Sequence, residues 1–142
     1  MIFCDTSALA KYYVDETESA AVRSRLDAED EVIASELAGV ELMSTFHRQL
    51  RARKWTRGQF NDVAGQFNRD NTAEYWTWSP VSSATIGAAS QLYLSLPESV
   101  FLRVSDCLHL VTALHHGFDE VCTFDRHQLA AAQALGLAIL KL

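Results

Sequence analysis

Met1-Ile2-Phe3-Cys4-Asp5-Thr6-Ser7-Ala8-Leu9 is the stretch from which the fold can be worked out. A run of four apolar residues stops at Asp5, two small hydroxyl residues follow, and a helical pattern begins after them. The run predicts a buried strand, and its unbroken apolar character predicts a central position in a parallel sheet. Ligands bind beyond the carboxyl ends of such strands, where Asp5 would lie. The alternative is that Asp5 only caps the following helix, which is the better interpretation of this residue taken alone.

Strand-like and helical segments alternate along the rest of the chain. Further strands are predicted at 31–34, 75–79, 120–124 and 137–140, and helices at 7–14, 17–28, 36–53, 56–70, 82–94, 106–116 and 126–135. Alternation of this kind predicts a mainly parallel sheet covered by helices on both faces, an α/β fold of three layers. The length fits one domain with one sizeable core, so we expect a single domain of residues 1–142.

Composition narrows the class of protein. A net charge of −6 argues against a protein that coats nucleic acid non-specifically, but it leaves room for an enzyme that admits one strand locally. Cys4, Cys107 and Cys122 are scattered among apolar residues without a CxxC pair, which predicts core residues in a reducing compartment and disfavours a zinc site or a disulfide framework. The start lacks a basic leader and no apolar stretch approaches the roughly 18 residues of a membrane span, so we expect a cytoplasmic protein that does not enter membranes.

Three aspartates fall where a site would form. Asp125 follows the fourth predicted strand as Asp5 follows the first, and Asp106 opens the helix before that fourth strand. At about 100° per residue, Asp106 shares a stripe with apolar residues at i+4 and i+7, so it points inward. Inward carboxylates close to one another need a cation to stay ionised, and a cluster of hard oxygens suits Mg²⁺ or Mn²⁺.

A fourth acid would come from the helix after the second predicted strand. Glu36 and Glu41 are the two candidates. Glu41 lies among apolar neighbours, whereas Glu36 is in the first turn and could simply favour the helix dipole. Periodicity leaves the choice between them open.

Four blocks of sequence together resemble the PIN domain, and within it they are most similar to the VapC toxins of bacterial toxin–antitoxin pairs. The blocks are Asp5-Thr6-Ser7-Ala8-Leu9, Val40-Glu41-Leu42, Asp106-Cys107-Leu108-His109-Leu110-Val111-Thr112-Ala113-Leu114 and Thr123-Phe124-Asp125-Arg126. Their order and spacing fit over nearly the whole chain. The resemblance selects Glu41 over Glu36. Cys107 departs from it, because the family more often has alanine there, and residues 95–104 have no clear match.

The resemblance implies a five-stranded parallel sheet in the order 3-2-1-4-5 and a Mg²⁺-dependent endoribonuclease. It places Asp5, Glu41, Asp106 and Asp125 in one acidic pocket. Asp5 and Asp106 would be the firmest metal ligands and Asp125 a ligand directly or through water. Thr6, Ser7 and Thr123 would support the cluster by hydrogen bonds. An RNA substrate, a cognate antitoxin and a homodimer are implied as partners.

These residue types permit metal-assisted hydrolysis of a phosphodiester, in which Glu41 or Asp125 orients or deprotonates the attacking water. No histidine nucleophile is required. His109 lies off the apolar stripe of its helix, so we expect it to be structural or exposed and not catalytic.

A basic stretch has three interpretations. It contains Arg48, Arg51, Arg53, Lys54 and Arg57. It could be a rim that contacts RNA phosphates, a solvated helix end, or part of the groove that grips the antitoxin in this family. Two rival functions are a PIN-like scaffold that does not cut and a receiver-like signalling module. A receiver would need a phosphoacceptor aspartate after a middle strand, whereas the third predicted strand ends in Ser79-Pro80.

Overall fold

The computed structural model describes residues 1–140, and in this range five short strands alternate with seven helices. The strands are β1 (Ile2–Phe3), β2 (Val32–Ser35), β3 (Thr77–Ser79), β4 (Glu120–Val121) and β5 (Ala138–Ile139). The helices are α1 (Thr6–Tyr13), α2 (Ser19–Leu26), α3 (Leu37–Arg51), α4 (Arg57–Thr72), α5 (Ser83–Ser95), α6 (Val104–His115) and α7 (Arg126–Ala134). The domain predicted at 1–142 extends two residues further, and these two lie outside the described residues.

The sheet is interrupted between β1 and β4. Strands β1, β2 and β3 form one parallel sheet, and β4 and β5 form a second. A single parallel bridge between Cys4 and Cys122 links the two, with hydrogen bonds from Cys122 N to Phe3 O at 2.9 Å and from Asp5 N to Cys122 O at 3.1 Å. The bridge places β4 next to β1, but the prediction of one five-stranded sheet in the order 3-2-1-4-5 needs correction, because the strands are divided into a sheet of three and a sheet of two. Pairing stops after one bridge because the chain turns into α1 directly after Asp5.

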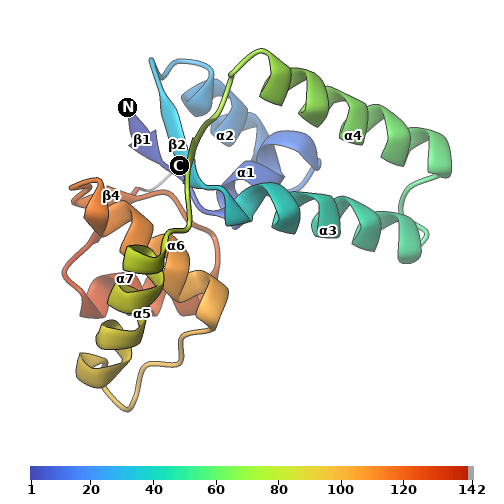
Figure 1. Cartoon of the computed structure of the whole chain (residues 1–142). Coiled ribbons are helices and arrows are strands. Elements are labelled where there is room, and N and C mark those ends of the chain that lie inside the picture. The colour runs from blue at the N-terminus through green and yellow to red at the C-terminus, as the bar shows by residue number, and fades with distance from the viewer. Residues whose placement is uncertain (141–142) are drawn as a thin grey trace.

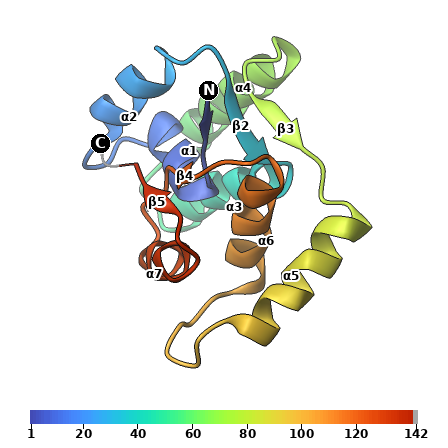
Figure 2. The same ribbon diagram turned by 90° about the vertical axis from the view of Figure 1, so that its left-hand side faces the viewer.

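Helices cover both faces of the strands. Side chains alternate across a strand, so Ile2 and Cys4 lie in a core formed with α1–α4, while Phe3 lies in a second core formed with α5–α7. Figures 1 and 2 show these layers, with α3 and α4 running as an antiparallel pair away from the strands and α5–α7 on the other side. The burial of β1 on both faces agrees with its predicted central position.

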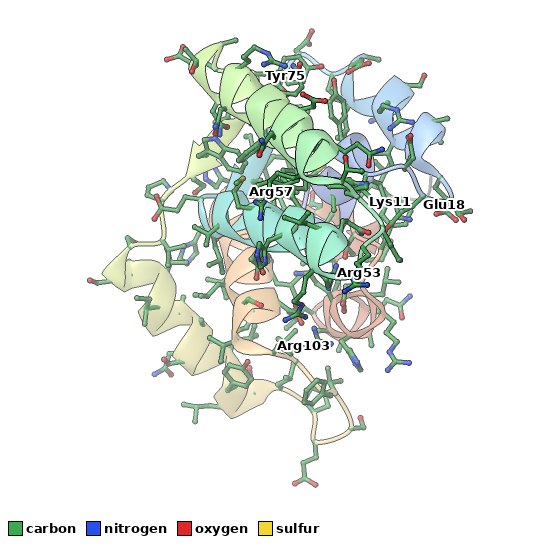
Figure 3. The ribbon with its side chains drawn as sticks, turned by 90° about the vertical axis from the view of Figure 1, so that its right-hand side faces the viewer. Lys11, Glu18, Arg53, Arg57, Tyr75 and Arg103 are labelled. Carbon is green, nitrogen blue, oxygen red and sulfur yellow. The ribbon has the colours of Figure 1, made fainter. Side chains whose placement is uncertain are left out.

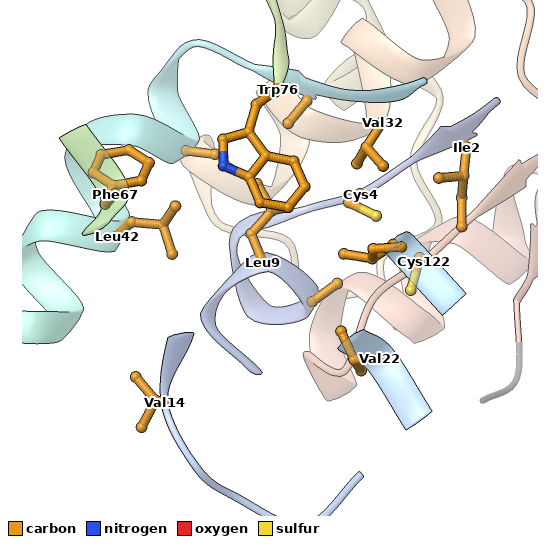
Figure 4. Packing of buried hydrophobic residues seen from close by; sticks show 14 of the residues in the cluster. Ile2, Cys4, Leu9, Val14, Val22, Val32, Leu42, Phe67, Trp76 and Cys122 are labelled. Carbon is orange, nitrogen blue, oxygen red and sulfur yellow. The ribbon is translucent and has the colours of Figure 1, made fainter. Parts of the chain in front are cut away.

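The core around β1 fixes the ends of the strands that carry the site. Leu9 of α1 and Trp76 before β3 are almost fully buried in it (Figure 4). Burying an aliphatic or aromatic side chain of this size contributes about 1.5–3 kcal/mol. Cys4 and Cys122 are free thiols in the same core, as is Cys107 in the other, which confirms that the cysteines are core residues. Within residues 1–140, every helix is too short or too polar to cross a bilayer.

Candidate active site

One pocket of about 410 Å³ opens where β1 and β4 end. All four predicted acids line it, namely Asp5, Glu41, Asp106 and Asp125. Glu36 does not, because its side chain turns to the segment after β3, where its Oε1 accepts a hydrogen bond from Val81 N at 2.8 Å. The pocket therefore gathers carboxylates from segments that are far apart in the sequence, and the choice between Glu36 and Glu41 falls geometrically on Glu41.

Asp5 caps a helix and faces the pocket at the same time. As the N-cap of α1, it accepts a hydrogen bond from Ala8 N on Oδ1 at 2.9 Å. Ser7 Oγ donates to Oδ1 at 2.7 Å, and Thr123 Oγ1 donates to Oδ2 at 2.6 Å. Burial raises the pKa of Asp5, and the hydrogen bond from Thr123 offsets this only in part, so the pKa stays above its usual range. The two interpretations of Asp5 from the sequence are thus compatible.

The same two hydroxyl groups join the end of β1 to the segment after β4. Ser7 Oγ accepts a hydrogen bond from Phe124 N at 2.7 Å, and Thr123 Oγ1 accepts one from Asp125 N at 3.1 Å. Each hydroxyl therefore donates to Asp5 and accepts from a backbone N–H of the segment after β4. This cross-link holds the first and last acids of the pocket next to each other.

Asp106 is the acid with the least local support. It lies in the first turn of α6, is 9% exposed, and its buried Oδ2 has no hydrogen-bond partner among the described residues. Burial and then the charge of Asp125 raise its pKa, whereas Arg103 and His109 lower it less. An ionised carboxylate in this position lacks a compensating partner, which is costly in a buried site.

Asp125 is placed by α7. Its Oδ1 caps that helix by accepting hydrogen bonds from His127 N at 2.8 Å and Gln128 N at 3.1 Å. Buried Gln128 in turn donates from Nε2 to Asp106 O at 3.1 Å, which ties α7 to α6. The helices that carry the third and fourth acids are therefore fixed relative to one another.

Glu41 is held by a residue that we expected to be structural or exposed. His109 is 2% exposed, and its Nε2 lies 2.9 Å from Glu41 Oε2 and 3.2 Å from Thr6 Oγ1. Thr6 Oγ1 also donates to Glu41 Oε2. Burial raises the pKa of Glu41, but the hydrogen bonds from His109 and Thr6 outweigh it and lower the pKa below its usual range.

Of the two alternatives for His109, structural or exposed, the exposed one is therefore wrong. The signal was present in the sequence, because residues at i and i+3 share one face of a helix and His109 is three residues after Asp106. The apolar stripe of i+4 and i+7 does not include this position, whereas the i+3 relation to Asp106 puts the imidazole on the side of the acids, where it contacts Glu41.

Three cations also line the pocket: Lys11, Arg48 and Arg103. Lys11 is engaged, because its Nζ lies 3.0 Å from Glu18 Oε2 and 4.9 Å above the ring of Phe124. Figure 3 shows Lys11 and Glu18 close together and Arg103 apart from them at the start of α6. The arginines are thus the cations best able to meet an anionic ligand.

The remaining basic residues of the predicted stretch lie outside this pocket. They are exposed on the turn between α3 and α4 and at its ends, and they are Arg51, Arg53, Lys54 and Arg57. Figure 3 shows Arg53 and Arg57 on this part of the surface. Only Arg48 of the five belongs to the pocket lining.

The donor set fits a hard divalent cation. The orphaned Oδ2 of Asp106 and the buried Asp5 are oxygen donors in a site with surplus negative charge. Within residues 1–140, no group of three or more His, Cys, Asp or Glu side chains is arranged tightly enough to hold an ion by itself. Mg²⁺ is commonly bound through one or two carboxylates and keeps several waters, so such a group is not required. Asp5, Asp106 and Asp125 are the residues that could hold it.

Known proteins are similar to this chain over the segment that contains all four acids. The family model described as "PIN domain" matches residues 2–134. The chain is similar to Ribonuclease VapC46 of Mycobacterium tuberculosis (strain ATCC 25618 / H37Rv), with 30% identity over 141 residues that span 98% of this chain and 95% of that protein.

Solved structures share the fold, and two of them are the following. One is VapC20 of Mycobacterium tuberculosis, described as a Sarcin-Ricin loop cleaving toxin, with a TM-score of 0.71 and 16% identity over 92% of this chain and 95% of that chain. The other is FitAcB from Neisseria gonorrhoeae, with a TM-score of 0.76 and 18% identity over 99% of this chain and 97% of that chain. At these identities, the structures establish the architecture alone.

Proposed function

This chain belongs to the PIN domain family and to its VapC-like ribonuclease toxins, and from that premise we propose that it is a Mg²⁺-dependent or Mn²⁺-dependent endoribonuclease that acts as the toxin of a type II toxin–antitoxin pair. The observation that carries the proposal is the convergence of four acids in one pocket, with Asp106 Oδ2 buried and unpartnered. A site of this charge and chemistry favours a hard divalent cation and, beside it, a phosphodiester.

The acids divide into two groups by their surroundings. The pKa values of Asp5 and Asp106 are raised, chiefly by burial, so these carboxylates gain most from a cation. The pKa of Glu41 is lowered, because hydrogen bonds from His109 and Thr6 outweigh its burial. Titratable groups whose pKa values are moved in opposite directions commonly mark different catalytic roles.

In the proposed mechanism, Asp5 and Asp106 would hold the ion directly and Asp125 would hold it directly or through water. The ion would supply a water of lowered pKa and would neutralise charge on the phosphate. Glu41 stays ionised and orients the attacking water or accepts its proton. Ser7 and Thr123 hold Asp5 in place, and Thr6 holds Glu41.

The test is a cleavage assay on fluorophore-labelled RNA with Mg²⁺ or with EDTA. We expect cleavage that EDTA abolishes, and a loss of at least about 100-fold in kcat for Asp5→Asn and for Glu41→Gln, the scale of a general base. Glu36→Gln is the matched control, because Glu36 lies just before the same helix but outside the pocket. Full activity in Asp5→Asn would overturn the mechanism. Absence of metal-dependent cleavage by the unmodified chain would favour a PIN-like scaffold that does not cut.

The partners of the proposed toxin are an RNA, a cognate antitoxin and a second copy of the chain. The exposed basic residues at the α3–α4 turn support contact with one of the first two. Co-expression with the gene product encoded immediately upstream tests the antitoxin, which should co-purify and suppress cleavage. Light scattering of the purified chain tests the homodimer, for which a monomeric mass would be the contrary result.

A further inference from the structure

His109 has polar contacts on one side of its ring only. Nε2 meets two groups of the acidic pocket, Glu41 Oε2 at 2.9 Å and Thr6 Oγ1 at 3.2 Å. Nδ1 is buried and has no hydrogen-bond partner among the described residues. The ring belongs to α6, whereas Glu41 belongs to α3 and Thr6 to α1. The imidazole therefore connects three helices at one point in the pocket.

The two environments of the ring decide which nitrogen carries the proton. A proton on Nδ1 would bury a donor without an acceptor and would set the lone pair of Nε2 against the carboxylate of Glu41. A proton on Nε2 is donated to Glu41 Oε2 and leaves only an acceptor unpaired. Nε2–H is therefore the donor. Thr6 Oγ1 donates to the same oxygen, so two donors converge on Glu41 Oε2.

We propose that His109 is a positioning residue of this nuclease, whose Nε2–H fixes Glu41 Oε2 and leaves Oε1 as the oxygen that meets the attacking water. The inference rests on the proposed function, and it assigns a task to a residue outside the four acids. Orientation matters because a misplacement of about 1 Å in a catalytic group can reduce the rate about 100-fold.

A purely structural histidine would have its hydrogen bond outside the pocket. The side chain of Glu41 is 29% exposed, whereas that of His109 is 2% exposed, so the hydrogen bond runs from the interior to the pocket wall. A second histidine of the same region provides the contrast. His116, the C-cap of α6, has its Nε2 2.8 Å from Ser79 Oγ at the end of β3, outside the pocket lining. Removing its hydrogen bond is the matched structural control.

Two substitutions separate the donor from the volume of the ring. His109→Gln keeps an amide nitrogen near the position of Nε2, whereas His109→Asn places its amide near Nδ1 and cannot reach Glu41. In the RNA cleavage assay, we expect kcat to fall about 10- to 100-fold in His109→Asn with KM changed less than about twofold, and to stay within about threefold in His109→Gln. His116→Asn should leave both constants unchanged.

A second measurement does not depend on activity. An NMR titration of the Glu41 side-chain carboxyl, in ¹³C-labelled metal-free protein, reports how His109 affects it. We expect the pKa of Glu41 to rise in His109→Asn and to stay near the unmodified value in His109→Gln and His116→Asn. Thermal unfolding of each variant shows whether any loss of activity follows from unfolding alone.

The outcomes are distinct. An unmodified chain that does not cleave RNA overturns the proposed function, and with it the catalytic part of this inference. A chain that cleaves, with His109→Asn equal to His109→Gln in kcat and in the Glu41 titration, overturns the positioning role and leaves the proposed function intact. Loss of kcat in step with loss of folded protein would also overturn it, because that is the result of a structural role.

Discussion

Replacing Asp106 by asparagine should stabilise the metal-free protein and make it insensitive to Mg²⁺. The side chain is 9% exposed, its Oδ2 lacks a partner among the described residues, and burial and the charge of Asp125 raise its pKa. An ionised Asp106 in the folded state therefore lacks a compensating partner. Asparagine is nearly isosteric and removes that charge, so the free energy of unfolding without metal should increase.

The magnitude follows from the cost of a buried polar group without a partner, about 1–3 kcal/mol. The amide keeps one unpaired atom, so we expect a gain of about 1–2 kcal/mol, near the lower end. A domain of this size changes its Tm by roughly 2–4 °C per kcal/mol, which corresponds to a rise of about 2–8 °C. Mg²⁺ at 100 times its Kd stabilises a folded protein by about 2.7 kcal/mol, so the unmodified chain should gain roughly 5–11 °C from it.

The assay is thermal unfolding of both proteins in EDTA and in a Mg²⁺ series, with Glu36→Gln as the control. The variant should unfold at the higher temperature in EDTA and the unmodified chain at the higher temperature in saturating Mg²⁺. This reversal of order identifies a carboxylate that destabilises the folded protein without metal and stabilises it when it binds an ion. Equal Mg²⁺-dependent shifts in the two proteins would refute the reasoning, because Asp106 would then not bind the ion.

Three further predictions concern the same pocket and its surroundings. Burial raises the folded-state pKa values of Asp5 and Asp106 above those of the unfolded chain. Between the unfolded-state and folded-state pKa values, the folded protein therefore binds more protons than the unfolded chain. The contribution of these two groups to the free energy of unfolding without metal should rise as the pH falls from neutral through their folded-state pKa values. Urea unfolding at several pH values measures this, and the Asp5→Asn/Asp106→Asn double variant should show a weaker dependence. Thr123→Val should cost about 1–3 kcal/mol by leaving Asp125 N without its acceptor and should reduce cleavage, whereas Thr123→Ser should retain both, as seen in unfolding and in kcat. Arg51→Ala and Arg53→Ala should each reduce the salt dependence of RNA affinity by about one unit of slope if they contact phosphates, and an unchanged slope would assign them to the solvated helix end or the antitoxin surface.

The alternation of elements and the positions of Asp5, Asp106 and Asp125 could be predicted from the sequence because both are local signals. The apolar run before Asp5 marks a strand whose end the next residue must cap, and the pattern after Thr123 repeats this logic. Helix periodicity alone predicts that Asp106 points inward, and Asp106 is buried in the structure. Glu41 could not be chosen over Glu36 in this way, because the contact that fixes Glu41 comes from His109 on a different helix.

The division of the sheet was also beyond the local signals. A continuous five-stranded sheet would require β1 and β4 to pair over several residues, but each ends almost as soon as they meet, at the Cys4–Cys122 bridge. Strand length depends here on where the chain must leave the sheet to form the site, and that is a tertiary requirement. The sequence contains the hydroxyl groups of Ser7 and Thr123, but it does not show which backbone groups they bind.

The hydroxyl cross-link explains why the short bridge is an advantage for the pocket. Thr123 lies one residue past the bridge on one side, as Asp5 does on the other, and their side chains meet at 2.6 Å. A longer ladder would carry both residues into regular strand geometry, where successive side chains point to opposite faces of the sheet. Ending the pairing at a single bridge instead frees Asp5 to cap α1 and Asp125 to cap α7, so each of these two acids is fixed at the start of a helix beside the pocket. The interruption of the sheet is therefore part of how the chain brings like charges together.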